Sequence, residues 1–303
     1  MVRVVRRARC YGTTRQVRRH DARPRDAHDA RPRDGQGDRP RGRKDASLGV
    51  RGRVVRPAWH PGVMMVRGKV LDAVATAVAG HGRARLVVGV DGADGVGKTV
   101  FADALALTLG ARGRPVVRVS LDGFHHPRAV RYRRGRDSAE GCYLDSFDLR
   151  AFEESVVTPI RAARRPAVDL PTTIRTASFD HRSETPVHPP PVLLRRDAVV
   201  LVDGVFLHRP ELVGLWDLTV LLVAPVAVGV GRMGSRDGTP RDPDDPWNWR
   251  YVEAQRLYRE QCDPERLASI VIDNTDVDSP RMLRERGGIG DVPDAPGSAE
   301  RAE

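Results

Sequence analysis

The stretch Gly92-Ala-Asp-Gly-Val-Gly97-Lys98-Thr99 decides the fold of this 303-residue chain. It matches the pattern G-x-x-x-x-G-K-[S/T] in full, and the apolar run at 86–90 directly precedes it. Phe101, Leu105 and Leu109 follow it at helical spacing. A strand, a glycine-rich loop and a helix in this order predict a phosphate-binding loop, because backbone N–H groups and the helix N-terminus surround phosphate oxygens.

The lysine of this loop stands out in a chain that otherwise uses arginine. Only 3 of the 51 basic residues are lysine, namely Lys44, Lys69 and Lys98. We expect Lys98 to reach the β- and γ-phosphates of a nucleotide and the hydroxyl of Thr99 to bind Mg²⁺. The residues expected to bind the nucleotide are Gly92, Asp94, Gly95, Val96, Gly97, Lys98, Thr99 and Val100.

Strand-like and helix-like stretches alternate along the chain, which predicts an α/β fold with a mainly parallel sheet. Helical periodicity over 149–160 and 251–258 predicts two amphipathic helices. The proline-rich stretch 186–191 is expected to be a connector. Strands are expected at 86–90, 116–121, 198–202, 218–223 and 270–272.

The net charge of +11 is concentrated at the start of the chain. Residues 1–60 hold 18 of the 51 basic residues and only 6 of the 40 acidic ones, so the rest of the chain is nearly neutral. The segment 1–62 repeats Asp-Ala-Arg-Pro-Arg-Asp and has little apolar surface to bury, which predicts a disordered tail. We favour a solvated tail, or translated sequence upstream of a start at Met64 or Met65, over a basic arm for nucleic acid or an anionic membrane. A second disordered tail is expected over 284–303, which leaves 63–283 as the folded domain.

Composition excludes several classes of protein. The three cysteines are too few and too scattered for a disulfide framework or a zinc site. No apolar run reaches the length of a membrane span, and the first residues lack the apolar core of a secretory signal. We therefore expect a cytoplasmic protein.

Two acidic residues stand where apolar strands end. Asp122 follows the strand at 116–121 and Asp203 follows the strand at 198–202. Ligands of parallel sheets bind at the carboxyl ends of the strands, so Asp122 could accept the proton of a substrate hydroxyl and Asp203 could bind Mg²⁺ together with Thr99. On position alone, a turn cap is the alternative for each.

Several motifs follow the phosphate loop in a fixed order. They are Asp122-Gly-Phe-His125, Tyr143-Leu-Asp145-Ser-Phe-Asp148, Phe179-Asp180-His181-Arg182, Asp203-Gly-Val-Phe and Arg232-x-x-x-Arg236-Asp237. Over about residues 68–278 this order resembles the uridine kinase/phosphoribulokinase family of P-loop kinases. The resemblance implies the P-loop NTPase fold: a five-stranded parallel sheet flanked by helices, a small β-hairpin substrate region and a lid.

The resemblance also implies roles for individual residues. Asp122 stands at the position of the catalytic base, and Lys98, Arg232 and Arg236 complete the expected catalytic set. The glycine-flanked stretch 231–238 carries both arginines and is expected to hinge as a lid, with a helix C-terminus bearing two solvated arginines as the alternative. The residues implied for the acceptor site are His125, Asp145, Asp180, His181 and Arg182.

The implied activity is transfer of phosphate from ATP, with Mg²⁺, to the 5′-hydroxyl of uridine or cytidine. Three residues depart from the usual uridine kinase pattern: Asp94 in the loop, Asp203 in place of glutamate and His125 in place of tyrosine. Nicotinamide riboside, pantothenate or a sugar phosphate therefore stay open as acceptors, as do a nucleotide switch and a nucleic-acid-associated ATPase. We expect a small-molecule partner, a nucleoside first, rather than a membrane or nucleic acid, and a homo-oligomer stays open.

Trp247 and Trp249 could stack on a base, but packing on the core is the favoured interpretation.

Overall fold

The computed structural model describes residues 61–164 and 171–286. Most of residues 1–62 and 284–303, expected to be disordered tails, lies outside these ranges. The described fold begins at Pro61, the first residue of helix α1 (Pro61–Gly80), and ends with strand β10 (Arg281–Glu285). It therefore extends two residues beyond the expected domain, 63–283, at both ends.

A six-stranded sheet with the order β10-β9-β8-β1-β7-β2 forms the centre of the fold. Five neighbouring strands are parallel, as expected, and β10 adds an antiparallel edge strand that the sequence analysis did not predict. Every expected strand is present, within two residues at either end. The parallel strands are β1 (Leu86–Gly92), β2 (Val116–Ser120), β7 (Val199–Asp203), β8 (Leu218–Val223) and β9 (Ile270–Asp273).

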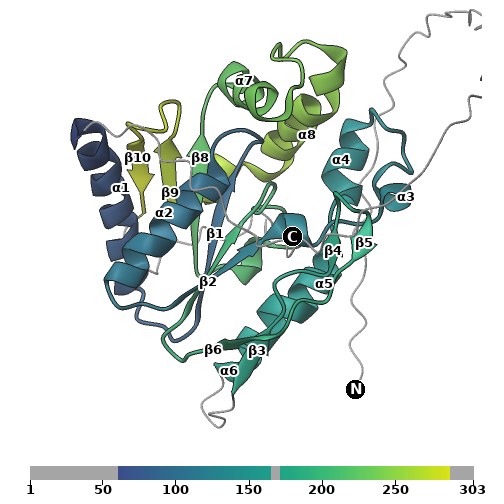
Figure 1. Cartoon of the computed structure of the whole chain (residues 1–303). Coiled ribbons are helices and arrows are strands. Elements are labelled where there is room, and N and C mark those ends of the chain that lie inside the picture. The colour runs from purple at the N-terminus through teal and green to yellow at the C-terminus, as the bar shows by residue number, and fades with distance from the viewer. Residues whose placement is uncertain (1–60, 165–170, 287–303) are drawn as a thin grey trace, which may run out of the picture. The chain divides into compact units, whose positions relative to one another are not determined.

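Helices cover both faces of this sheet (Figure 1). Helices α1 and α2 pack with one another and with one face of β1, β7, β8 and β9 in a single apolar cluster. Helices α4, α5, α6 and α8 contribute to a second cluster with the other face. Alternate residues of β7 point to opposite clusters, Leu201 to the first and Val202 to the second, as expected for a strand buried on both sides.

The helices have the periodic faces that the sequence predicted. Phe101, Leu105 and Leu109 are all buried on α2. The predicted helix over 149–160 is one helical run with a π-helical segment, η2, in its middle. The helices after α1 are α2 (Lys98–Ala111), η1 (Leu121–Gly123), α3 (Arg128–Arg131), α4 (Ala139–Asp145), α5 (Leu149–Phe152), η2 (Glu153–Val157), α6 (Thr158–Ala163), η3 (Val213–Leu215), α7 (Val226–Asp237), α8 (Pro246–Cys262) and α9 (Pro264–Leu267).

Two small antiparallel pairs lie outside the main sheet. Strands β3 (Thr172–Ile174) and β6 (Val192–Leu194) form one pair, and β4 (Phe179–Asp180) and β5 (Thr185–Pro186) form the other. The second pair is the expected β-hairpin. It is attached to the segment after β2, because the N–H of Ser178 donates to the carbonyl of Gly123 at 2.8 Å.

Strand register brings the predicted site residues to one edge of the sheet. Asp203, the last residue of β7, pairs with Val90 of β1 on one side and with Ser120 of β2 on the other. The phosphate loop, Asp203 and Asp122 therefore all follow the carboxyl ends of adjacent parallel strands. Among the described residues, no helix is long and apolar enough to cross a membrane.

Candidate active site

The phosphate loop connects β1 to α2, as predicted. At Gly95, φ is +72°, and a Cβ atom there would lie 2.0 Å from the carbonyl oxygen of Gly229 in α7. Gly97, which precedes the first turn of α2, has φ of +100°. Only glycine fits both positions, so the backbone of the loop lies against α7 and opens directly into the N-terminus of α2.

Two polar side chains hydrogen-bond to the backbone of this loop: Asn274, from outside the motif, which sequence reasoning missed, and Lys98, which it predicted. The buried amide of Asn274, in the segment after β9, donates to the carbonyl of Val96 at 2.7 Å. Lys98 is half-buried, and its Nζ donates to the carbonyl of Ala93 at 2.9 Å. The ammonium group thus lies over the loop where phosphate oxygens are expected. Val100 is 58% exposed on α2.

Asp203 and Thr99 lie together, as predicted. The Thr99 hydroxyl donates to Oδ2 of Asp203 at 2.8 Å, and Asp203 is buried. Oδ1 of Asp203 pairs with Arg118 of β2 at 2.8 Å, and Arg118 also pairs with Asp103 on α2 at 3.0 Å. A hydroxyl and a carboxylate oxygen this close are hard ligands of the kind Mg²⁺ takes, so these two residues fit the metal. Among the described residues there is no cluster of three or more His, Cys, Asp or Glu side chains that could hold a metal.

Asp122 lies at the start of the 3₁₀ turn η1, with its side chain exposed. Its backbone N–H donates to the Ser120 hydroxyl at 3.3 Å, and its carbonyl accepts from Nδ1 of His125 at 2.9 Å. The carboxylate itself makes no hydrogen bond with the described residues. The carboxylate is therefore available to an acceptor. The hydroxyl of Ser120, and not the carboxylate of Asp122, caps this turn.

Charges from three segments act on one another at this edge. Burial raises the pKa of Asp94 in the phosphate loop; the charges of Lys98 and Arg236 oppose this, and that of Asp122 adds to it. The hydrogen bond to Asp237 raises the pKa of Arg236, and the charges of Asp94 and Asp122 raise it further. The charges of Asp122, Lys98 and Arg236 thus all act on the carboxyl group of Asp94.

The expected lid, 231–238, is the C-terminal part of helix α7 rather than a hinge. Gly234 explains the difference, since a Cβ there would lie 2.5 Å from the Cγ of Arg241; the glycine is a packing position and not a hinge point. Arg232 donates to the carbonyls of Asn274 and Thr275 at 3.1 and 2.7 Å, and to that of Val96 in the phosphate loop at 3.5 Å. Arg236 pairs with Asp237 at the exposed end of the helix.

An aromatic stack lies at the expected acceptor position. The ring of His125 lies 4.5 Å from that of Phe147 and 4.4 Å from that of His181. Burial lowers the pKa of His125, although its bond to the Asp122 carbonyl and the charge of Asp122 oppose this. The lowered pKa favours the neutral form of the His125 imidazole, and the three tilted rings together offer an aromatic surface to an acceptor.

Two expected acceptor residues are already engaged with the protein. Asp145 is buried, and its carboxylate oxygens accept from Arg133 and Arg134. Burial alone would raise the pKa of Asp145, but these arginines hold it below its usual range. Asp180 accepts from the backbone N–H of Arg182 and from the Ser183 hydroxyl, which makes it a cap of the β4–β5 turn. The side chain of Arg182 is exposed.

Beneath the phosphate loop lies a buried polar network that the sequence analysis did not identify. Asp91 is the penultimate residue of the fully buried strand β1 and accepts from the N–H of Gly92 at 2.7 Å. Its other oxygen accepts from the Tyr258 hydroxyl and from Nδ1 of His208, the latter at 2.7 Å. Burial alone would raise the pKa of Asp91, but the hydrogen bond and charge of His208 and the hydrogen bond of Tyr258 outweigh it and lower the pKa. The network ties the loop to α8 and to the segment after β7.

The two tryptophans do not pack on the core, so the favoured interpretation was wrong. Trp247 is 44% exposed and Trp249 is 57% exposed, at the start of α8. The Trp247 ring lies 5.6 Å from that of Tyr251. Both tryptophans lie in the first turn of α8, where the buried positions are instead Asn248 and Arg250.

Solved structures place this fold among known proteins. A possible uridine kinase from Bacillus stearothermophilus matches 67% of this chain and 97% of its own length, with 24% identity and a TM-score of 0.52. A D-glycerate 3-kinase from Cryptococcus neoformans is also similar, with 14% identity over 74% of this chain and 100% of its own length and a TM-score of 0.44. The phosphoribulokinase from Rhodobacter spheroides has 14% identity over 67% of this chain and 81% of its own length, with a TM-score of 0.42. No protein-family model matches the chain. With its parallel sheet, phosphate loop and flanking helices, the chain has the fold of the P-loop kinases.

Proposed function

We propose that this protein is an ATP- and Mg²⁺-dependent kinase of a small-molecule alcohol, with the 5′-hydroxyl of uridine or cytidine as its first candidate acceptor. The observation that carries the proposal is the free carboxylate of Asp122 beside a complete phosphate loop. Its charge acts on Asp94 of that loop and on Arg236 of α7. A nucleotide-binding switch has no need of such a carboxylate.

The proposed roles follow from the positions of the residues. Lys98 and the loop N–H groups hold the β- and γ-phosphates. Thr99 and Asp203 hold Mg²⁺, which neutralises charge on the phosphates when bound. Asp122 takes the proton from the acceptor hydroxyl as its oxygen bonds to the γ-phosphorus, and the bond to the β,γ-bridging oxygen breaks, releasing ADP. Arg236 stabilises charge on the transferring group, and Arg232 anchors α7 to the segment after β9.

The aromatic stack supports a nucleoside acceptor. A pyrimidine can lie against the aromatic cluster that the rings of His125, Phe147 and His181 form. The similarity to the possible uridine kinase from Bacillus stearothermophilus supports this acceptor.

A specific observation favours a second acceptor class, a sugar phosphate or another alcohol outside the nucleosides. Asp145 was expected to bind the ribose hydroxyls, but Arg133 and Arg134 occupy both of its oxygens. Arg128, at the start of α3, and Arg182, on the β4–β5 hairpin, are exposed and suit an acceptor that carries its own phosphate.

The test is acceptor-dependent ATP consumption by the full chain with Mg²⁺. The panel is uridine, cytidine, nicotinamide riboside, pantothenate and ribulose 5-phosphate, with a no-acceptor control. Turnover with uridine or cytidine supports the first candidate, and turnover with ribulose 5-phosphate alone supports the second. ATP binding without acceptor-dependent turnover across this panel contradicts both.

The variant Asp122→Asn tests the role of the base. We expect kcat to fall by about 10² or more, because general base catalysis contributes about that much, while ATP affinity stays unchanged. Asp72→Asn is the matched control, since Asp72 is an exposed acid on α1. Near-normal turnover by Asp122→Asn would show that another group takes the proton.

A further inference from the structure

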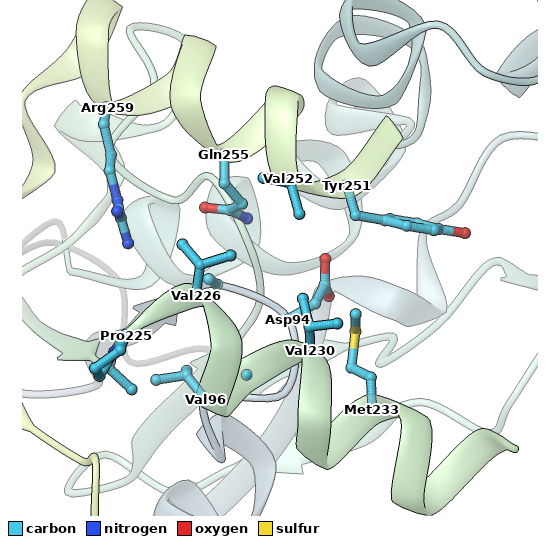
Figure 2. Close-up of a pocket in the computed structure, with 13 residues that line it drawn as sticks. Asp94, Val96, Pro225, Val226, Val230, Met233, Tyr251, Val252, Gln255 and Arg259 are labelled. Carbon is cyan, nitrogen blue, oxygen red and sulfur yellow. The ribbon is translucent and has the colours of Figure 1, made fainter. Parts of the chain in front are cut away.

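A pocket lies between α7, α8 and the phosphate loop (Figure 2). Its walls are mainly apolar: Val226, Val230 and Met233 come from α7, and Val252 from α8. Val230 and Met233 are buried, so the pocket extends below the protein surface. Most of its lining has no part in the function proposed above.

Two hydrogen-bond donors without partners line this pocket. Gln255 is only 9% exposed, and its Nε2 has no hydrogen-bond partner among the described residues. A buried donor left unpaired is costly, so it calls for a partner that the chain itself does not supply. Arg259 also lines the pocket, and its guanidinium makes no hydrogen bond or ion pair with the described part of the chain.

The two donors are arranged as a pair. Gln255 and Arg259 are four residues apart on α8, so they lie one turn apart on the same helix face. Figure 2 shows both side chains extending from α8 toward α7, with Arg259 at the end of the pocket near Pro225. Asp94 lies at the other end, close to Val230 and Met233. An amide N–H and a guanidinium on the same helix face are suited to a carboxylate, and the walls of the pocket are suited to an apolar body.

We propose that this pocket binds a small carboxylic acid with an apolar aliphatic or aromatic body. The carboxylate accepts from Gln255 Nε2 and from the Arg259 guanidinium. The body lies against Val226, Val230 and Val252. The site is separate from the acceptor stack at His125 and does not depend on the kinase activity.

The site has a direct connection to the nucleotide. Ala93, Asp94 and Val96 of the phosphate loop form one wall of the pocket. A ligand that changes the affinity of this loop for phosphate must have its own affinity changed by the same factor when nucleotide binds. The pocket is therefore placed to take a regulatory ligand.

The experiment titrates the full chain with hydrocinnamate and, in parallel, with hydrocinnamyl alcohol, and follows binding by ligand-detected NMR. The alcohol keeps the apolar body and loses the charge. We expect hydrocinnamate to bind more tightly than the alcohol by roughly tenfold or more, the usual difference for a charge-assisted hydrogen bond. Equal binding of acid and alcohol, or no binding of the acid, would overturn the proposal.

Three variants locate the binding. Arg259→Gln and Gln255→Met are each expected to weaken hydrocinnamate binding roughly tenfold. Arg256→Gln is the matched control, because Arg256 is on the same helix but pairs with Glu253 and Glu260 outside the pocket. Unchanged binding by both pocket variants would place hydrocinnamate elsewhere and refute the site.

Gln255→Met also separates binding from folding. Methionine fills the same space and removes the unpaired buried amide, so the unliganded variant is expected to melt no lower than the wild type. Loss of hydrocinnamate binding with unchanged melting assigns the amide to the ligand. A marked fall in melting temperature would show that Gln255 has a structural partner, which the proposal excludes.

Discussion

Replacing Tyr258 by phenylalanine removes a single hydroxyl from beneath the phosphate loop. That hydroxyl donates to Oδ2 of Asp91 and accepts from the N–H of His208 at 3.0 Å. The aromatic ring, which lies 5.2 Å from that of Phe206, is kept, so no cavity forms. The variant therefore measures hydrogen bonding alone.

The expected cost follows from the groups left behind. The N–H of His208 loses its partner in a fully buried place, and Asp91 keeps only Gly92 and His208. An unsatisfied buried polar group costs about 1–3 kcal/mol, so we expect the free energy of unfolding to fall by roughly 2–4 kcal/mol. For a domain of this size, each kcal/mol lowers the melting temperature by about 2–4 °C, which gives a shift of roughly 5–15 °C.

The assay is thermal unfolding by circular dichroism, with Tyr251→Phe as the control. The hydroxyl of Tyr251 has no hydrogen-bond partner among the described residues, so its removal should shift the melting temperature by no more than about 1 °C. Equal shifts for the two variants would refute the reasoning, since the network would then contribute nothing to stability.

Tyr258→Phe is also expected to change how the stability of the protein depends on pH. The pKa of Asp91 is lowered in the folded state, so its ionised form contributes stability above its unfolded pKa of about 4, and this is lost as the pH falls through the folded value. Tyr258→Phe weakens that lowering. The difference in stability between variant and wild type should therefore narrow as the pH falls below about 4.

Three further changes test other parts of the site. Gly95→Ala places a methyl group against the backbone of α7 at a positive φ, so we expect loss of ATP binding measured by calorimetry; wild-type affinity would contradict the close contact. Arg118→Met leaves the buried Asp203 with Thr99 as its only side-chain partner among the described residues, and a lower urea midpoint of unfolding is expected, with an unchanged midpoint as the contrary result. Hydrogen bonds from Thr275 and Arg281 hold the pKa of Asp273 at about 2, so they contribute stability above about pH 4 that is lost as the pH falls toward 2. Arg281→Gln should reduce this pH dependence of the urea midpoint, and an identical profile would show that the pair is not formed.

The parts of the site that sequence predicted are those encoded locally. The phosphate loop, its flanking strand and helix, and Asp203 beside Thr99 follow from motif spacing and from the rule that ligands bind where parallel strands end. Arg118 was not predicted because its contact with Asp203 requires β7 to lie between β1 and β2. The order of strands in a sheet cannot be inferred from the residues of any single strand. The same holds for His208 and Tyr258, which reach Asp91 from 117 and 167 residues away.

The expected lid, 231–238, is an error of the opposite kind, because its local sequence indicated a hinge where the structure has a helix. Gly231 and Gly234 lower helix propensity and favoured a hinge. In the structure the tight approach of residues 239–241 to Gly234 requires the absence of a side chain there, so the glycine stabilises the helix through packing. Asp145 is a related case, because a carboxylate placed by resemblance at the acceptor was expected to be free, and two arginines earlier in the chain occupy it.

The backbone contact between Gly95 and Gly229 sets which parts of the protein can move. A Cβ on Gly229 would lie 2.7 Å from the carbonyl of Asp94, so neither segment can slide past the other without separating. The first half of α7 and the phosphate loop thus behave as one rigid body, further fastened by Arg232 on the segment after β9. Any opening must pivot beyond Arg232, near Gly238, where φ is +72°. Arg236 precedes this point and stays with α7. Such a pivot would therefore move the segment after Gly238, while Arg236 and the nucleotide cradle kept their places.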